Sequence, residues 1–149
     1  MTTRGFEDYT QGSEWEFGPL EVNEAEVIDF GQRFDPQPFH VDPVAAAAGP
    51  YGGLIASGWH TCALMMWLLA EQYLSPASSL GSPGIDELRW ILPVRPGDKL
   101  TLKATVREAR RSRSKADRGL IRTHVELVNQ RGEVVLSLLA MNLIRTSPL

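Results

Sequence analysis

The fold is decided by one apolar stretch, Trp59-His-Thr-Cys-Ala-Leu-Met-Met-Trp-Leu-Leu-Ala-Glu-Gln-Tyr73. Ser57-Gly58 stands immediately before it, where a helix can begin. Over these fifteen or so residues, apolar side chains fall on nearly every side of a helix, and a helix of that kind must be covered by the rest of its domain. The pattern predicts a long helix at the centre of the fold.

On the C-terminal side of this helix the hydrophobic period changes to two. Apolar Leu100, Leu102, Ala104 and Val106 alternate with polar residues, which is typical of a strand with one wet face. The last apolar run is the richest and is expected inside the sheet. The predicted strands cover residues 84–92, 100–107, 120–128 and 134–144. Helix and strands together predict an α+β fold, a curled antiparallel β-sheet wrapped around the central helix.

On the N-terminal side, residues 1–22 are predicted to be a loop with at most one short strand. Asn23 can cap a helix over the following residues, with Glu26 completing a capping box. Pro36 and Pro38 stop that helix, so residues 34–41 are expected to form an irregular, fixed segment. Asp42 is then placed to cap a further helix that begins with Pro43.

Length and composition restrict the function classes. The 149 residues predict one domain, 1–149, and a net charge of −3 gives no reason to expect nucleic-acid binding. One cysteine and three scattered histidines predict neither an internal disulfide nor a metal site. The start has no secretory signal pattern, and no apolar run approaches the ~20 residues that cross a bilayer. We therefore expect a cytoplasmic protein without membrane contact.

Two titratable residues stand on the proline-stiffened segment, Asp35 and His40. A carboxylate and an imidazole held in fixed relation can bind one water and deprotonate it near neutral pH. The alternative is structural: Asp35 ends a helix and His40 is a partly buried side chain with its hydrogen bonds satisfied. From the residues alone, both interpretations stay open.

At these residues the sequence resembles a known family. Asp35-Pro-Gln-Pro-Phe-His40 is similar to the Asp, four residues, His signature of the MaoC-like dehydratases and (R)-specific enoyl-CoA hydratases, which have the hot dog fold. The resemblance continues through Gly52-Gly-Leu-Ile-Ala-Ser-Gly-Trp59 and Leu92-Pro-Val-Arg-Pro-Gly-Asp98. The family signature usually has Gly before the Asp and Asn before the second Pro, where this chain has Phe34 and Gln37.

The resemblance implies a hydro-lyase of fatty acid metabolism. Its reaction would be the reversible hydration of a trans-2-enoyl thioester to an (R)-3-hydroxyacyl thioester. The resemblance implies that Asp35 and His40 bind the water and share the proton transfers. Donors for the oxyanion or substrate are expected near the start of the central helix, at Gly53, Ser57 and Gly58, for which loop and capping roles are the alternative. No cofactor or metal is expected, since coenzyme A enters only as part of the substrate, with acyl carrier protein as the other carrier.

Two rival functions stay open beside the hydratase. A hot dog acyl-CoA thioesterase would cleave the thioester, but its carboxylate typically stands on or beside the helix, where Glu71 is chemically isolated. A non-catalytic hot dog module would only bind an acyl ligand. The open edges of a curled sheet further predict a homodimer or higher homo-oligomer, whose second copy completes the site.

Overall fold

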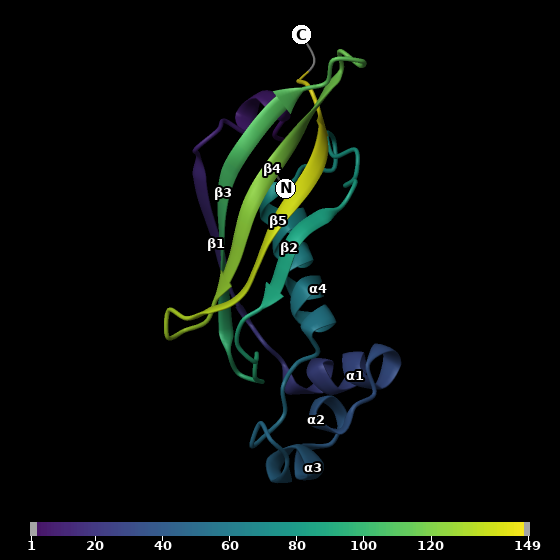
Figure 1. Cartoon of the computed structure of the whole chain (residues 1–149), viewed down its shortest axis with the longest axis vertical. Coiled ribbons are helices and arrows are strands. Elements are labelled where there is room, and N and C mark those ends of the chain that lie inside the picture. The colour runs from purple at the N-terminus through teal and green to yellow at the C-terminus, as the bar shows by residue number, and fades with distance from the viewer. Residues whose placement is uncertain (1–2, 148–149) are drawn as a thin grey trace.

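Five antiparallel strands form a single sheet in the computed structural model, which describes residues 3–147 (Figure 1). Their order across the sheet is β1-β3-β4-β5-β2. The long strands β3, β4 and β5 form its middle, and β1 and β2 are the two edges. The bounds are β1 Glu14–Glu21, β2 Ile85–Trp90, β3 Lys99–Arg111, β4 Arg118–Val128 and β5 Val134–Arg145.

The helices lie on one side of the sheet and beyond one of its ends. Helix α4 runs along the sheet, and α1, α2 and α3 gather beyond the end at which α4 begins (Figure 1). The bounds are α1 Glu24–Phe34, α2 Pro38–Val41, α3 Pro43–Ala48 and α4 Gly58–Leu68. Helix α4 continues into a π-helical turn, η2 Leu69–Tyr73, and a short 3₁₀ helix, η1 Phe6–Asp8, precedes β1.

The central helix is confirmed, since α4 and η2 together cover residues 58–73. Its inner side chains, such as Met65 and Leu68, are buried with Leu102 and Leu136 of the sheet in one hydrophobic core. The sequence predicted that the helix would be covered on every side, but its outer side is not: Trp59 and Trp67 are 60% and 53% exposed. The sheet curls along the helix without closing around it, so within one copy of the chain only one side of α4 is covered. The architecture is the α+β hot dog fold.

The predicted strands are confirmed, and β5 lies inside the sheet between β4 and β2. The alternating residues of β3, from Leu100 to Val106, are buried on the side that faces the core. Strands β2 and β3 are neighbours in sequence but not in the sheet: β2 pairs with β5, with Ile85 opposite Ala140. The connection leaves the β2 edge and re-enters the sheet at β3, beyond β5 and β4. On the way it passes the residues just before α4, where the Ala56 N–H donates to the Val94 carbonyl oxygen at 2.8 Å.

The proline segment corrects one prediction. Residues 38–41 form a helical turn, α2, instead of irregular chain. Proline is tolerated there because Pro38 takes the first helical position, where its missing N–H is not needed. The caps are confirmed: Asn23 accepts from the Glu26 N–H at 3.0 Å, and Asp42 accepts from Val44 N–H at 3.0 Å. Within residues 3–147, the Glu26 side chain makes no return bond to Asn23.

Across the described residues, none of the helices is long and apolar enough to span a membrane.

Candidate active site

Asp35 and His40 come together because α1 and α2 pack closely. Asp35 is the residue directly after α1, at its C-terminal cap, and His40 lies five residues further on, in α2. The close approach depends on Gly31, where an added Cβ would lie 2.9 Å from Val41 Cγ1 and 3.0 Å from His40 Cβ. A side chain at position 31 would require Val41 or His40 in α2 to shift.

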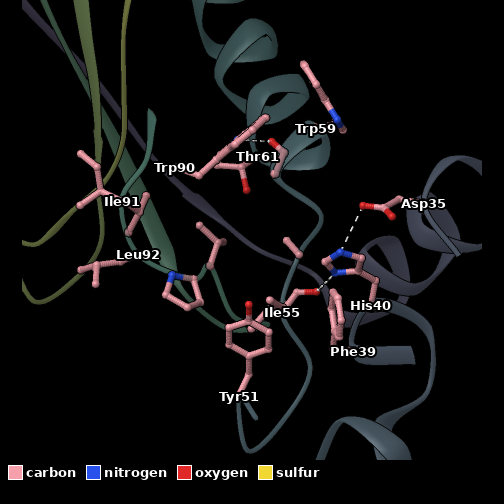
Figure 2. Close-up of a pocket in the computed structure, with 15 residues that line it drawn as sticks. Asp35, Phe39, His40, Tyr51, Ile55, Trp59, Thr61, Trp90, Ile91 and Leu92 are labelled. Carbon is pink, nitrogen blue, oxygen red and sulfur yellow. Dashed lines mark hydrogen bonds and ion pairs between the residues drawn. The ribbon is translucent and has the colours of Figure 1, made fainter. Parts of the chain in front are cut away.

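The imidazole of His40 is fixed at both nitrogens. Nδ1 lies 2.7 Å from the carbonyl oxygen of Ile55, and Nε2 lies 3.2 Å from Asp35 Oδ2 (Figure 2). A carbonyl oxygen can only accept, so Nδ1 carries a hydrogen, and Nε2 is the nitrogen that can gain or lose a proton beside Asp35. His40 is only 5% exposed, which keeps this orientation.

Asp35 receives hydrogen bonds on both carboxylate oxygens. Ser57 Oγ donates to Oδ2 at 2.7 Å, and Gln37 Nε2 donates to Oδ1 at 2.7 Å. Burial raises the pKa of Asp35, but the two donors and the neighbouring His40 imidazole outweigh it, so the pKa lies below the usual value. The side chain is therefore an ionised acceptor near neutral pH.

The pair opens into a cavity of about 470 Å³ between the helical end of the molecule and β2 (Figure 2). Its polar groups come from Asp35, His40, Tyr51 and Thr61. The remaining wall is mostly apolar, with Ile55, Trp90, Ile91, Leu92 and Val94 among its residues. A cavity with one polar end and an apolar wall suits a molecule with an apolar chain next to a polar reacting group.

The first residue of α4, Gly58, also lines this cavity. The Trp90 indole N–H donates to the Gly58 carbonyl oxygen at 2.8 Å, and the Trp90 ring lies over Gly58 so tightly that an added Cβ would be 2.5 Å from Trp90 Cε2. Only glycine fits under this ring. Its own N–H belongs to the positive end of the α4 dipole, where a negative charge is stabilised.

The structure separates the sequence-predicted site residues into three groups. Asp35, His40 and Gly58 line the cavity together. Ser57 is fully buried, and it holds Asp35 and caps α4 by accepting from the Trp59 N–H at 3.3 Å. Gly53 lies outside the cavity wall, where an added Cβ would meet only Arg95 Nη1, at 3.5 Å.

Sequence reasoning missed Tyr51, Thr61 and Trp90 in the cavity wall and Gln37 as a partner of Asp35. These residues come from separate segments, and no spacing pattern links them. Of these four residues, only Gln37 could have been predicted from the sequence, because it lies two residues after Asp35. Across residues 3–147, no group of three or more His, Cys, Asp or Glu side chains could hold a metal ion.

Comparison with known proteins identifies a family and relatives. A model of the MaoC like domain matches residues 9–128. The uncharacterized protein YdeM of Bacillus subtilis is 31% identical over 94 residues, which are 63% of this chain and 67% of YdeM. The 3-hydroxyacyl-thioester dehydratase Z of Mycobacterium tuberculosis is 39% identical over 67 residues, 44% of each protein. The match thus spans less than half the length of that dehydratase.

Among solved structures, the crystal structure of a MaoC-like dehydratase from Rhodospirillum rubrum is similar over nearly its whole length. The TM-score is 0.90 at 37% sequence identity, and the alignment covers 99% of this chain and 100% of the other. The segment from α1 to α3, which includes Asp35 and His40, falls within the part that is shared.

Proposed function

Because this chain belongs to the MaoC-like domain family, we propose that it catalyses the reversible hydration of a trans-2-enoyl thioester to an (R)-3-hydroxyacyl thioester. The family and the similar R. rubrum structure are of the dehydratase kind, which supports a hydro-lyase. The observation that carries the proposal is the Asp35–His40 pair, 3.2 Å apart at the polar end of a cavity with an apolar wall.

In this proposal the pair binds and deprotonates one water. The water oxygen forms a bond to C3 as one of its protons passes to the pair, with His40 Nε2 as the accepting nitrogen and Asp35 stabilising the charged imidazole. The electrons of the double bond move onto the thioester oxygen. C2 then takes a proton from the pair, which returns to its starting state. Proton transfer of this kind contributes on the order of 10²–10⁴ in rate.

The negative charge on the thioester oxygen needs a donor that is already in position. We assign this role to the N–H of Gly58, because Gly58 lines the same cavity and stands at the first position of α4. Ser57, the residue before Gly58, donates its hydroxyl hydrogen to Asp35. Its part in the proposal is to hold that carboxylate.

We further propose that a second copy of the chain covers the outer side of α4. Trp59, Met66 and Trp67 are all exposed there, and β2 is an open sheet edge beside them. An apolar surface beside a strand whose outer edge is unpaired is a surface that self-association removes from water. The substrate carrier, coenzyme A or acyl carrier protein, is the other partner in this proposal.

One assay separates the hydratase from its two rivals. The purified chain is mixed with trans-2-butenoyl-CoA and trans-2-octenoyl-CoA, and loss of the conjugated double bond and release of free thiol are followed in parallel. Loss of the double bond without thiol is the expected result. Release of thiol would instead support a thioesterase, and neither signal, with an acyl-CoA still bound, would support a non-catalytic module.

A further inference from the structure

Tyr51 presents a hydroxyl to the cavity that the proposed reaction does not use. Its side chain lines the cavity, and in Figure 2 the hydroxyl points toward the space enclosed by His40, Leu92 and Trp90. Within residues 3–147, this hydroxyl has no hydrogen-bond partner of its own. It is an available donor and acceptor in a cavity wall that is otherwise mostly apolar.

Tyr51 is held in part by Phe39, the neighbour of His40 in α2. Phe39 packs edge-on against both rings, with ring centroids 4.6 Å from His40 and 5.5 Å from Tyr51. The backbone beyond Tyr51 is tied to α2, because Ile55 N–H donates to the Phe39 carbonyl oxygen at 3.0 Å. From the other side, Arg95 Nη2 donates to the Tyr51 carbonyl oxygen at 2.6 Å. The Tyr51 ring and the imidazole therefore keep a fixed relation.

Tyr51 and His40 stand at different depths. His40 is 5% exposed, whereas Tyr51 is 40% exposed and so lies nearer the solvent. A thioester that places its reacting carbons at the buried His40 must lead its carrier arm outward toward the more exposed part of the cavity wall, of which Tyr51 is a member. In coenzyme A and acyl carrier protein alike, the first polar group along that arm is an amide, two methylene groups beyond the sulfur. An amide carbonyl that loses water against this mostly apolar wall is stabilised by a protein donor, and Tyr51 offers one.

We propose that the Tyr51 hydroxyl donates a hydrogen bond to this first amide carbonyl of the carrier arm. The inference rests on the proposed function for its substrate class. It makes Tyr51 a binding residue for the arm, separate from the proton transfer at Asp35 and His40. Tyr51 would then distinguish carrier-linked thioesters from simple alkyl thioesters of the same acyl group.

The test uses two saturated, unreactive ligands, so that binding is measured without turnover. Butanoyl-N-acetylcysteamine thioester contains the amide, and S-pentyl butanethioate replaces it with methylene groups. Dissociation constants are measured by titration calorimetry for the natural chain and for Tyr51→Phe. We expect Tyr51→Phe to weaken binding of the amide ligand about 3- to 10-fold, as loss of one hydrogen bond does, and to change binding of the alkyl ligand less than twofold.

Tyr9→Phe is the matched control. It makes the same chemical change at a buried hydroxyl that donates to the Tyr73 carbonyl oxygen, away from the cavity. It is expected to lower the melting temperature and to leave the ratio of the two dissociation constants unchanged. Equal losses for both ligands in Tyr51→Phe, no loss for either, or a natural chain that binds neither ligand would each overturn the role of Tyr51.

The result is independent of the hydration assay. A chain that shows the expected ligand pattern but hydrates no enoyl thioester retains Tyr51 as an arm-binding residue and refutes the proposed function. A chain that hydrates enoyl thioesters but lacks the pattern refutes the role of Tyr51 alone.

Discussion

The Ser57 hydroxyl donates a 2.7 Å hydrogen bond to Asp35 Oδ2 across 22 residues of sequence. The Ser57 hydroxyl oxygen also accepts from the Trp59 N–H at the start of α4. One buried side chain thus links the carboxylate at the end of α1 to the first turn of the central helix. The placement of Asp35 and the placement of the Gly58 N–H are therefore coupled.

Ser57→Ala should move the pH dependence of activity. The Ser57 donor favours the charged form of Asp35 and helps keep its pKa below the usual value, so removing it raises the pKa. The acidic limb of the kcat/KM profile should shift to higher pH. Loss of the helix cap should also lower the free energy of unfolding by about 1 kcal/mol. A pH–rate profile and urea unfolding measure the two effects.

Gln37→Met separates these two effects. It removes the exposed donor to Asp35 Oδ1 but leaves the cap of α4 in place. The acidic limb should shift in the same direction with little loss of stability. An acidic limb that stays in place in both variants would contradict the assigned role of these donors.

Gly58→Ala should damage both stability and activity. The new methyl group would lie 2.5 Å from Trp90 Cε2, so the indole must move and its hydrogen bond to the Gly58 carbonyl must break. Overpacking of this kind costs about 1–3 kcal/mol. Gly84→Ala is the matched control, because its methyl group would meet only Met141 Cε, at 3.6 Å. A Gly58→Ala variant that melts and turns over like Gly84→Ala would contradict the close packing.

Local signals in the sequence predicted the elements, and contacts between distant elements were out of reach. Periodicity located α4 and the long strands, and side-chain chemistry located the caps at Asn23 and Asp42. The eight-residue strand β1 gave a weak signal, because Gly18 and Pro19 interrupt its polar–apolar alternation after Phe17, where its pairing with β3 shifts register. The pairing of β2 with β5 depends on the global path of the chain, which no local pattern contains.

The candidate site likewise has local features that the sequence predicts and long-range contacts that it does not. Asp35 and His40 are five residues apart and share a recognisable signature, so sequence identified the pair. The contacts of Ser57 with Asp35 and of Trp90 with Gly58 join residues far apart in sequence. Their partners were unpredictable because they depend on how α1, α4 and β2 pack. The roles of Asp35, His40, Gly53, Ser57 and Gly58 in a reaction stay predictions.

His60 should make the stability of the fold depend on pH. Its ring stacks on Phe30 with centroids 4.9 Å apart, and its Nδ1 is buried without a hydrogen-bond partner in residues 3–147. Burial lowers the pKa of His60 below 6.5, against a weaker opposing effect of Glu26. The His60 imidazole therefore binds a proton more readily in the unfolded chain than in the folded one. The stability that depends on a neutral His60 is fully present above pH 6.5, and it is lost as pH falls through the folded pKa of His60.

Replacing His60 by an apolar residue of similar size, as in His60→Leu, should remove this proton linkage. The free energy of unfolding in urea is measured at pH 7.5, 6.5 and 5.5 for both chains. The natural chain should lose more stability between pH 7.5 and 5.5 than His60→Leu does. Equal losses in the two chains would show that His60 does not carry the effect.

Met66→Lys should disrupt self-association. Met66 is exposed on the outer side of α4, in an apolar groove that it shares with Phe34, Trp59 and Ile85. A lysine charge there would have to be buried if a second copy packed on the groove, which is costly. Light scattering should report a dimer for the natural chain and a monomer for the variant. Val44→Lys, at an exposed apolar residue on α3, is the matched control and should remain dimeric.

The most direct test of the proposed reaction is the rate of double-bond loss from trans-2-enoyl-CoA in Asp35→Asn and His40→Ala. Asparagine keeps the shape of the Asp35 side chain and removes its charge, and alanine removes the Nε2 that faces it. Each variant should remain folded and lose on the order of 10²–10⁴ in kcat relative to the natural chain. Folded variants that remove the double bond at the natural rate would contradict the assignment of the water-activating pair.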